Sequence, residues 1–291
     1  MNALLPTEPV TNALALSATS PATRAAYSRH WLRWASWCEG RGACALPATP
    51  GAVADYLVEC NGAGFALATL KAYCAAISVA HQAAGLDSPT RALLVRKTLQ
   101  GAAKASRPAK KAAALTFGDL GALVAAAQGP LAVRDRAALL VAFWGALRGD
   151  DLAGLTVAAL DWQPWGVVLN VFGKTEKGNV ARRVPLERRG DALCPVTALE
   201  AWLPNASGAL FACFRGTDLL SDTLRRLARN AGVACRWSSH SLRAGLVTSA
   251  HRCGIAESDI QATTGHRSAD MLRGYIREAD LQRRCLTTRI G

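Results

Sequence analysis

The chain has 291 residues, 51% of them hydrophobic, which is enough for one large domain or two ordinary domains with real cores. Its charged residues are unbalanced, with 34 Lys and Arg against 21 Asp and Glu and a net charge of +13. A surface this basic gains free energy when it displaces counterions from phosphates. The composition therefore favours a polyanionic partner, with nucleic acid ahead of an anionic membrane surface.

The longest apolar run gives no membrane anchor. Residues 137–147 are too few to cross a bilayer, and they predict a buried helix. Residues 1–18 contain no Lys or Arg, so they lack the basic start of a signal peptide, and we expect a flexible tail there. We therefore predict a cytoplasmic protein without membrane attachment.

The cysteines argue against a metal site. There are nine, scattered without a C-x-x-C pair: Cys38, Cys44, Cys60, Cys74, Cys194, Cys213, Cys235, Cys253 and Cys285. That spacing favours neither a zinc site nor a disulfide framework. We expect small buried hydrophobic side chains and no bound metal.

The first helix is expected to begin at Ser20-Pro21. Its apolar residues Tyr27, Trp31, Trp34 and Cys38 have the spacing i, i+4, i+7, i+11, which is one face of an α-helix. The tryptophans could stack on bases, but the helical period favours a core stripe. We therefore interpret them as packing residues.

Three more helices follow in the first lobe. Thr49-Pro50 predicts an N-cap and first turn of a helix through Leu57, and residues 66–84 and 90–101 continue the helical pattern. Residues 19–104 carry nine Lys and Arg against four Asp and Glu. This stretch predicts a small, basic, all-helical domain.

A basic linker is expected over residues 105–114. The segment KASRPAKKAAA begins at Lys104 and contains a Pro but no acidic or large apolar side chain. Its charges can be a solvated run, a contact to a DNA backbone, or both. The candidate DNA-binding residues are Lys104, Arg107, Lys110 and Lys111.

The second lobe is predicted to be mainly helical with one small sheet. Thr116 with Asp119 matches a capping box, and Pro130 opens the apolar helix that runs to Leu147. Short β-branched runs then predict a three-stranded antiparallel sheet, over residues 155–160, 167–172 and 180–186. The helical period returns at Leu219.

Several residues of this lobe are chemically suggestive but ambiguous one by one. Arg148 in GALRGDDL follows a helix end, where an Arg often only offsets the helix dipole. Asp150 and Asp151 are neighbours on a helix and point about 100° apart, which disfavours a two-metal nuclease. Lys174 in GKTEKGN lies on a polar turn between two strands, where it is either solvated or able to reach a ligand.

His240 and Arg243 in SSHSLRAG suit a phosphate. They are three residues apart, so on a helix capped by Ser238 or Ser239 both project from one face near the helix start. Two cationic donors placed in this way can bind an anion. A short motif of this kind is also often structural.

The joint pattern is far more specific than its parts. His266 in TGH ends a helix, and Tyr275 lies nine residues later in MLRGYIRE. In order, G-x-L-R-x-x-D-L, a hairpin Lys before R-x-V-P-L, H-S-L-R-A-G, and G-H-R-S with Tyr at plus nine make a complete set. This set resembles the tyrosine recombinases of the phage integrase family, in their Cre- and Xer-like branch. The resemblance covers residues 19–291.

The resemblance implies a two-lobed DNA clamp. Residues 19–104 would be a helical, SAM-like core-binding domain, and residues 115–291 a tyrosine recombinase catalytic domain. The implied catalytic residues are Arg148, Lys174, His240, Arg243, His266 and Tyr275. Asp151 would support them where the family commonly has Glu.

The implied activity is cutting and rejoining of DNA through a 3′-phosphotyrosyl link, without metal, ATP or another cofactor. The implied partners are a double-stranded recombination site and further copies of the chain, two per site and four in synapsis, for a nucleoid-associated enzyme of a mobile element. Two alternatives stay open: DNA relaxation of the type IB topoisomerase kind, and a catalytically inactive DNA-binding protein.

Overall fold

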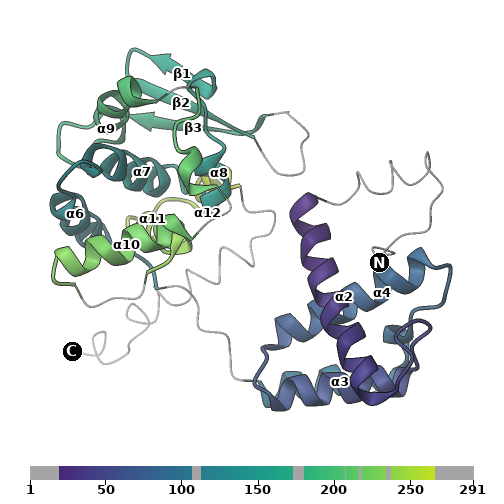
Figure 1. Ribbon diagram of the computed structural model, residues 1–291. Coiled ribbons are helices and arrows are strands. Elements are labelled where there is room, and N and C mark those ends of the chain that lie inside the picture. The colour runs from purple at the N-terminus through teal and green to yellow at the C-terminus, as the bar shows by residue number, and fades with distance from the viewer. Residues whose placement is uncertain are drawn as a thin grey trace, which may run out of the picture. The chain divides into compact units, whose positions relative to one another are not determined.

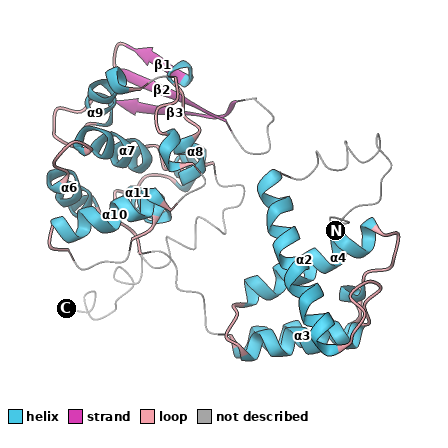
Figure 2. Cartoon of the chain, in the orientation of Figure 1, coloured by secondary structure: helices cyan, strands magenta, loops and turns pink. Residues whose placement is uncertain are grey.

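The computed structural model describes residues 20–106, 113–172, 180–206, 208–215, 218–233 and 237–265. The chain divides into two compact units, Met1–Lys110 and Lys111–Gly291 (Figure 1). Each unit has its own hydrophobic core. In the described residues, the first unit is all helical and the strands lie in the second (Figure 2).

The described residues of the first unit form four α-helices and a short 3-10 helix. They are α2 (Pro21–Arg41), α3 (Pro50–Gly62), α4 (Leu67–Ala83), η1 (Pro89–Arg91) and α5 (Leu93–Ala105). The Ser20 Oγ accepts a hydrogen bond from the Thr23 amide, and the Thr49 Oγ1 accepts one from the Ala52 amide. Both caps precede a Pro at the first helical position, so the two predicted helix starts are confirmed.

The tryptophans of α2 pack inside the first unit. Trp34 and Cys38 are fully buried, and Trp31 packs against the same core. The Trp34 indole donates to the Ala45 carbonyl at 3.2 Å, and its ring contacts Tyr56 edge-on. The interpretation of this stripe as core is confirmed.

Where the structure describes it, the second unit is mainly helical with one three-stranded antiparallel sheet, as predicted. Its elements are α6 (Phe117–Ala126), α7 (Ala132–Trp144), α8 (Gly149–Ala153), η2 (Val157–Ala159), β1 (Leu160–Gln163), β2 (Gly166–Phe172), β3 (Val180–Glu187), α9 (Pro195–Trp202), η3 (Leu203–Asn205), η4 (Ala212–Phe214), α10 (Leu219–Asn230), α11 (Ser239–Arg252) and α12 (Glu257–Thr264). The strand order is β1-β2-β3. Among the described residues, no helix combines the length and apolar character that a membrane span requires.

The first strand does not lie where the sequence predicted it. Within residues 155–160, Val157–Ala159 form the 3-10 helix η2, and β1 begins only at Leu160, which pairs with Leu169 of β2. Leu155 and Ala159 are buried. The apolar residues of this segment therefore pack on the core from a turn and not from a strand. Burial alone does not separate these two structures in a short apolar run.

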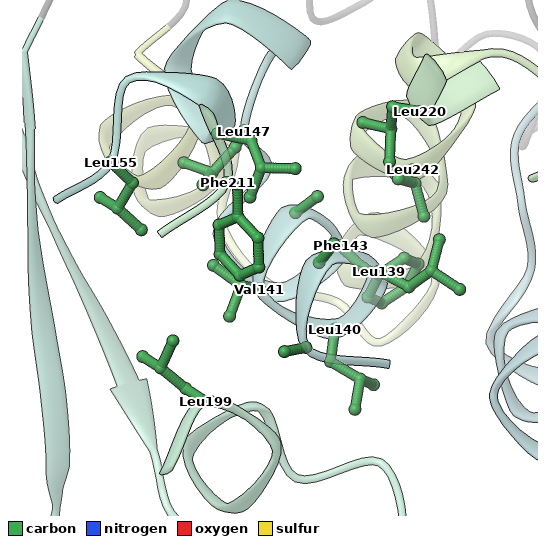
Figure 3. Close-up of a cluster of buried hydrophobic side chains, with 14 of the residues drawn as sticks. Leu139, Leu140, Val141, Phe143, Leu147, Leu155, Leu199, Phe211, Leu220 and Leu242 are labelled. Carbon is green, nitrogen blue, oxygen red and sulfur yellow. The ribbon is translucent and has the colours of Figure 1, made fainter. Parts of the chain in front are cut away.

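Helix α7 lies at the centre of the second unit. Residues 137–143 are buried on every side, which explains why their sequence is apolar without a period. In Figure 3, Leu139 and Phe143 of α7 lie toward Leu242 of α11, while Leu199 of α9 lies on the other side. The helix thus gives a rigid base to the loop that follows it.

The expectation that the cysteines are buried is wrong for three of them. Cys38, Cys60, Cys74 and Cys194 are buried, whereas Cys44, Cys213 and Cys253 are exposed. The exposed ones lie after α2, in η4 and directly after α11. Cys235 and Cys285 lie outside the described residues.

Candidate active site

The loop after α7 carries the first candidate catalytic residue. Its backbone reverses at Ala146, which has a φ of 45°, a left-handed conformation that is uncommon for a residue with a Cβ. Two residues later, the Arg148 amide donates to the Asp151 Oδ2 at 3.2 Å. The Arg148 Nη1 lies 3.8 Å from the same oxygen, and the side chain is 45% exposed. Asp151 therefore holds the backbone of Arg148, while the Arg148 side chain stays partly exposed to solvent.

The start of α11 is held by serines. Ser238 is the N-cap, and its amide donates to the Ser241 Oγ at 3.1 Å, so one of the two predicted caps is confirmed. The Ser239 amide donates at 3.1 Å to the Ser221 Oγ of α10. This bond joins the first turn of α11 to α10, and it fixes the backbone on which His240 lies exposed.

Arg148 and His240 line one cavity of about 370 Å³. The lining residues are Arg148, Gly149, Asp150, Phe214, Asp218, Leu220, Ser221, Ser239 and His240. A methyl group at Gly149 would lie 3.7 Å from the Ser239 Oγ, so the starts of α8 and α11 are in close approach. Two sequence motifs separated by about ninety residues thus meet around one cavity, where the guanidinium of Arg148 offers the kind of donor that binds a phosphate.

Arg243 lies deeper than the sequence suggested. The spacing of three placed it on one helical face with His240, but the residue is only 3% exposed and does not line the cavity. Its Nη1 donates at 2.6 Å to the Ala146 carbonyl, in the loop that carries Arg148. The structure therefore brings Arg148, His240 and Arg243 together, with the third inside the protein.

Sequence reasoning missed Arg182, the first Arg of R-x-V-P-L on β3. Its side chain is 9% exposed, and its Nη2 lies 3.4 Å from both the Asp151 Oδ2 and the Ala146 carbonyl. Its Nη1 donates to the Thr263 carbonyl of α12. Burial lowers the pKa of the Arg182 guanidinium, Asp151 raises it, and Arg148 lowers it further.

A signal for Arg182 was present in the sequence. Side chains alternate between the two faces of a strand, and Val184 and Leu186 are both buried. The same period places Arg182 on that apolar face, where a charged residue needs partners.

Other predicted site residues lie outside the described residues: Lys174, His266, Tyr275, Arg107, Lys110 and Lys111. Lys104 is described, and it is exposed in the last turn of α5. The described chain ends at Gly265, which caps α12 with a φ of 64° and directly precedes His266 in the sequence.

Residues 114–282, more than half of the chain, match the family model described as the phage integrase family. The chain belongs to this family. It is therefore a tyrosine recombinase, an enzyme of site-specific DNA recombination, as the motifs predicted. The match includes all six candidate catalytic positions.

Curated relatives agree with the assignment over most of the chain. An integrase/recombinase XerD homologue of Selenomonas ruminantium is 25% identical over 284 residues, which cover 89% of this chain and 82% of the relative. The recombinase Cre of Escherichia phage P1 is 24% identical over 280 residues, 85% of this chain and 81% of Cre. Both alignments extend well beyond residues 114–282.

Solved recombinase structures share the fold. The XerH site-specific recombinase, in a post-cleavage complex with a palindromic difH substrate, superposes with a TM-score of 0.62 at 20% identity. The superposition covers 81% of this chain and 70% of that one. The mainly helical architecture with a small antiparallel sheet is thus confirmed.

Proposed function

We propose that this recombinase cuts and rejoins duplex DNA at a specific site through a 3′-phosphotyrosyl intermediate on Tyr275, without metal or ATP. The observation that carries the proposal is the shared cavity of Arg148 and His240, with Arg243 bound to the loop beneath it. Arg148 and the His240–Arg243 pair come from two separate motifs, and the fold brings them together. Lys174, His266 and Tyr275 complete the set by their places in the family motifs.

The residue types suit transesterification at phosphorus. The Tyr275 hydroxyl attacks the phosphorus, so that a Tyr–O–P bond forms and the bond to the 5′-oxygen breaks. His240 accepts the phenolic proton, and Lys174 gives a proton to the departing 5′-oxygen. Arg148 and Arg243 offset the charge that grows on the non-bridging oxygens, because guanidinium keeps its charge and matches phosphate geometry.

The second half of the reaction needs no outside energy. A 5′-hydroxyl from a partner strand attacks the phosphotyrosine, releases Tyr275 and restores a phosphodiester. The number and kind of bonds are the same before and after, which is why neither ATP nor another cofactor is needed. His266 would hold the scissile phosphate or support Lys174.

We assign a different role on DNA to each of the two units and to the linker. Residues 19–104 serve as the core-binding domain, residues 105–114 as a basic linker, and residues 115–291 as the catalytic domain. The partner is a double-stranded recombination site that binds two copies of the chain, with four copies in synapsis. The relative XerH supports a DNA partner, because its structure contains the difH substrate. The cytoplasmic, nucleoid-associated location stays a prediction.

The first test is covalent trapping. The Tyr275→Phe variant selects a binding site from a pool of randomised duplexes by repeated gel shift, because the phenol oxygen contributes chemistry and not affinity. The selected duplex is then nicked near the cleavage point, so that the short 5′-product diffuses away and the adduct accumulates. The wild-type chain should form a covalent adduct on a denaturing gel, and Tyr275→Phe should form none.

Tyr27→Phe is the matched control, because it removes a phenol oxygen from the first unit, and it should trap DNA like the wild type. An adduct with Tyr275→Phe would contradict the assignment of the nucleophile. Absence of an adduct from the wild type on its selected site would favour the inactive DNA-binding alternative. Relaxation of a supercoiled plasmid without that site, by monomers, would favour the type IB topoisomerase alternative.

A further inference from the structure

Arg182 joins three segments of the second unit that are far apart in sequence. From β3 it reaches the Ala146 carbonyl after α7, the Asp151 carboxylate of α8 and the Thr263 carbonyl of α12. Two nitrogens of one guanidinium share these contacts: Nη1 donates to Thr263, and Nη2 serves Ala146 and Asp151. A planar fork with five N–H donors suits such a set of partners better than the single nitrogen of a Lys ammonium.

The aliphatic part of Arg182 also contacts the end of α12. A methyl group at Gly265 would lie only 3.1 Å from the Arg182 Cδ, and the Gly265 φ of 64° disfavours any side chain. The cap of α12 is therefore shaped around Arg182. His266 is the next residue in the sequence.

The guanidinium of Arg182 is engaged inside the protein, where its partners are the Thr263 and Ala146 carbonyls and the Asp151 carboxylate. Its side chain is 9% exposed, whereas that of Arg148 is 45% exposed and lines the cavity. Both cations nevertheless share the Oδ2 of Asp151, at 3.4 Å for Arg182 and 3.8 Å for Arg148. Arg182, the more buried of the two, thus lies closer to the Asp151 carboxylate, and Arg148 is paired with it less tightly.

This sharing has a chemical consequence. Without Arg182, the negative charge of Asp151 would be balanced mainly by Arg148, which would then be drawn from the cavity toward the carboxylate. Ala146 would lose one of the two guanidinium donors that hold its carbonyl in the left-handed turn. Both changes would displace the Arg148 guanidinium, which the proposed reaction uses.

We propose that Arg182 is a positioning residue of the recombinase, which neutralises Asp151 so that Arg148 stays available to the scissile phosphate and which binds the end of α12 to the Arg148 loop. The inference rests on the proposed function, because it assigns Arg148 to the phosphate. It extends the site to a residue that acts through Asp151 and Arg148.

The experiment compares Arg182→Met with Arg183→Met in single-turnover cleavage of the selected, nicked duplex. Arg183 is the matched control, since its side chain is 62% exposed and pairs with Asp161 on the surface. Arg182→Met should lower the cleavage rate constant by a factor on the order of 100, because small misplacements of catalytic groups have effects of that size. The DNA-binding Kd should change little, and Arg183→Met should cleave like the wild type.

Two further measurements separate positioning from general damage. A methylphosphonate at the cleavage point removes the charge that Arg148 offsets, so the defect of Arg182→Met should shrink on that substrate. Adding Asp151→Asn to Arg182→Met should restore part of the lost rate, because the unbalanced carboxylate is then gone. Arg182→Lys keeps the charge without the planar fork, and it should retain an intermediate rate even if Arg182→Met folds poorly.

Equal defects on phosphate and methylphosphonate, or no gain from Asp151→Asn, would overturn the proposal. Cleavage by Arg182→Met and Arg182→Lys at the wild-type rate would overturn it as well. A failure of the wild-type chain to cleave would instead contradict the proposed function, so the two failures are distinct.

Discussion

Asp135 is a buried carboxylate that holds two arginines near the candidate site. Its side chain is 1% exposed, it accepts from the Arg134 Nη2 at 2.8 Å, and it also pairs with Arg226 of α10. Arg134 in turn lies over the ring of Phe214, which lines the cavity. A side chain that takes no part in the reaction thus joins α7, α10 and the cavity wall.

Asp135→Asn should lower the free energy of unfolding by about 3–5 kcal/mol, since removing one partner of a buried ion pair leaves an uncompensated charge. Arg134 is the partner most affected, because its side chain is only 14% exposed. Chemical denaturation of the full chain measures the change. The control is Asp222→Asn, which breaks the exposed pair with Arg225 and should cost less than about 1 kcal/mol. If the two variants lost similar free energies of unfolding, the buried pair would stabilise the protein no more than the exposed one, which would contradict the prediction.

At the scale of elements, local chemistry made the helix starts predictable. Ser20, Thr49, Thr116 and Ser238 are confirmed as caps, because a cap depends on a few consecutive residues. The sheet and the central helix α7 were also predictable from residue type and apolar length. In contrast, the place of β1 and the depth of Arg243 depend on packing between distant segments, which no local pattern contains.

The same division applies to the candidate site. The spacing of motifs predicted Arg148, His240 and Arg243, and the structure brings them together. Arg182 was missed because its partners Ala146, Asp151 and Thr263 lie on other elements and become neighbours only in the fold.

Gly245 sets how closely α11 approaches the chain before α6. A methyl group there would lie 2.0 Å from the Leu115 carbonyl and 3.0 Å from the Phe143 ring. The Leu115 amide also donates to the Ser241 carbonyl at 3.0 Å, so the backbone contact is direct. A side chain at this position would push α11 away from Leu115. His240 and Arg243 lie on the same helix, so they would be displaced with it.

Gly245→Ala should therefore destabilise the chain by about 1–3 kcal/mol or more through overpacking, and it should slow covalent trapping as well. Gly101→Ala is the control, because nothing lies within 4 Å of an added methyl group in α5. That exchange should raise the stability by up to about 1 kcal/mol, the usual helix preference for Ala over Gly. Thermal unfolding and trapping on the selected duplex measure both effects, and a stable, active Gly245→Ala would contradict the packing argument.

At the scale of the whole molecule, positive charge is distributed over both units and the segment between them. Residues 19–104 carry nine basic and four acidic side chains, and residues 105–111 add three basic residues without an acidic one. Each phosphate that a cation neutralises releases counterions, so the salt dependence of binding reports how many cations lie on the backbone.

Exchanging Lys104, Lys110 and Lys111 together for Ala should make DNA binding less sensitive to salt. If each lysine neutralises one phosphate, the slope of log K against log salt should become less steep by about 2.7, at about 0.9 for each contact. Sequence preference should stay the same, because phosphate contacts position a protein and do not read bases. Gel-shift titrations of the selected duplex and of a scrambled one, at several salt concentrations, measure both quantities. The matching Lys→Arg triple variant keeps the charge and should keep the slope, whereas an unchanged slope in the Ala variant would mean that these lysines are only solvated.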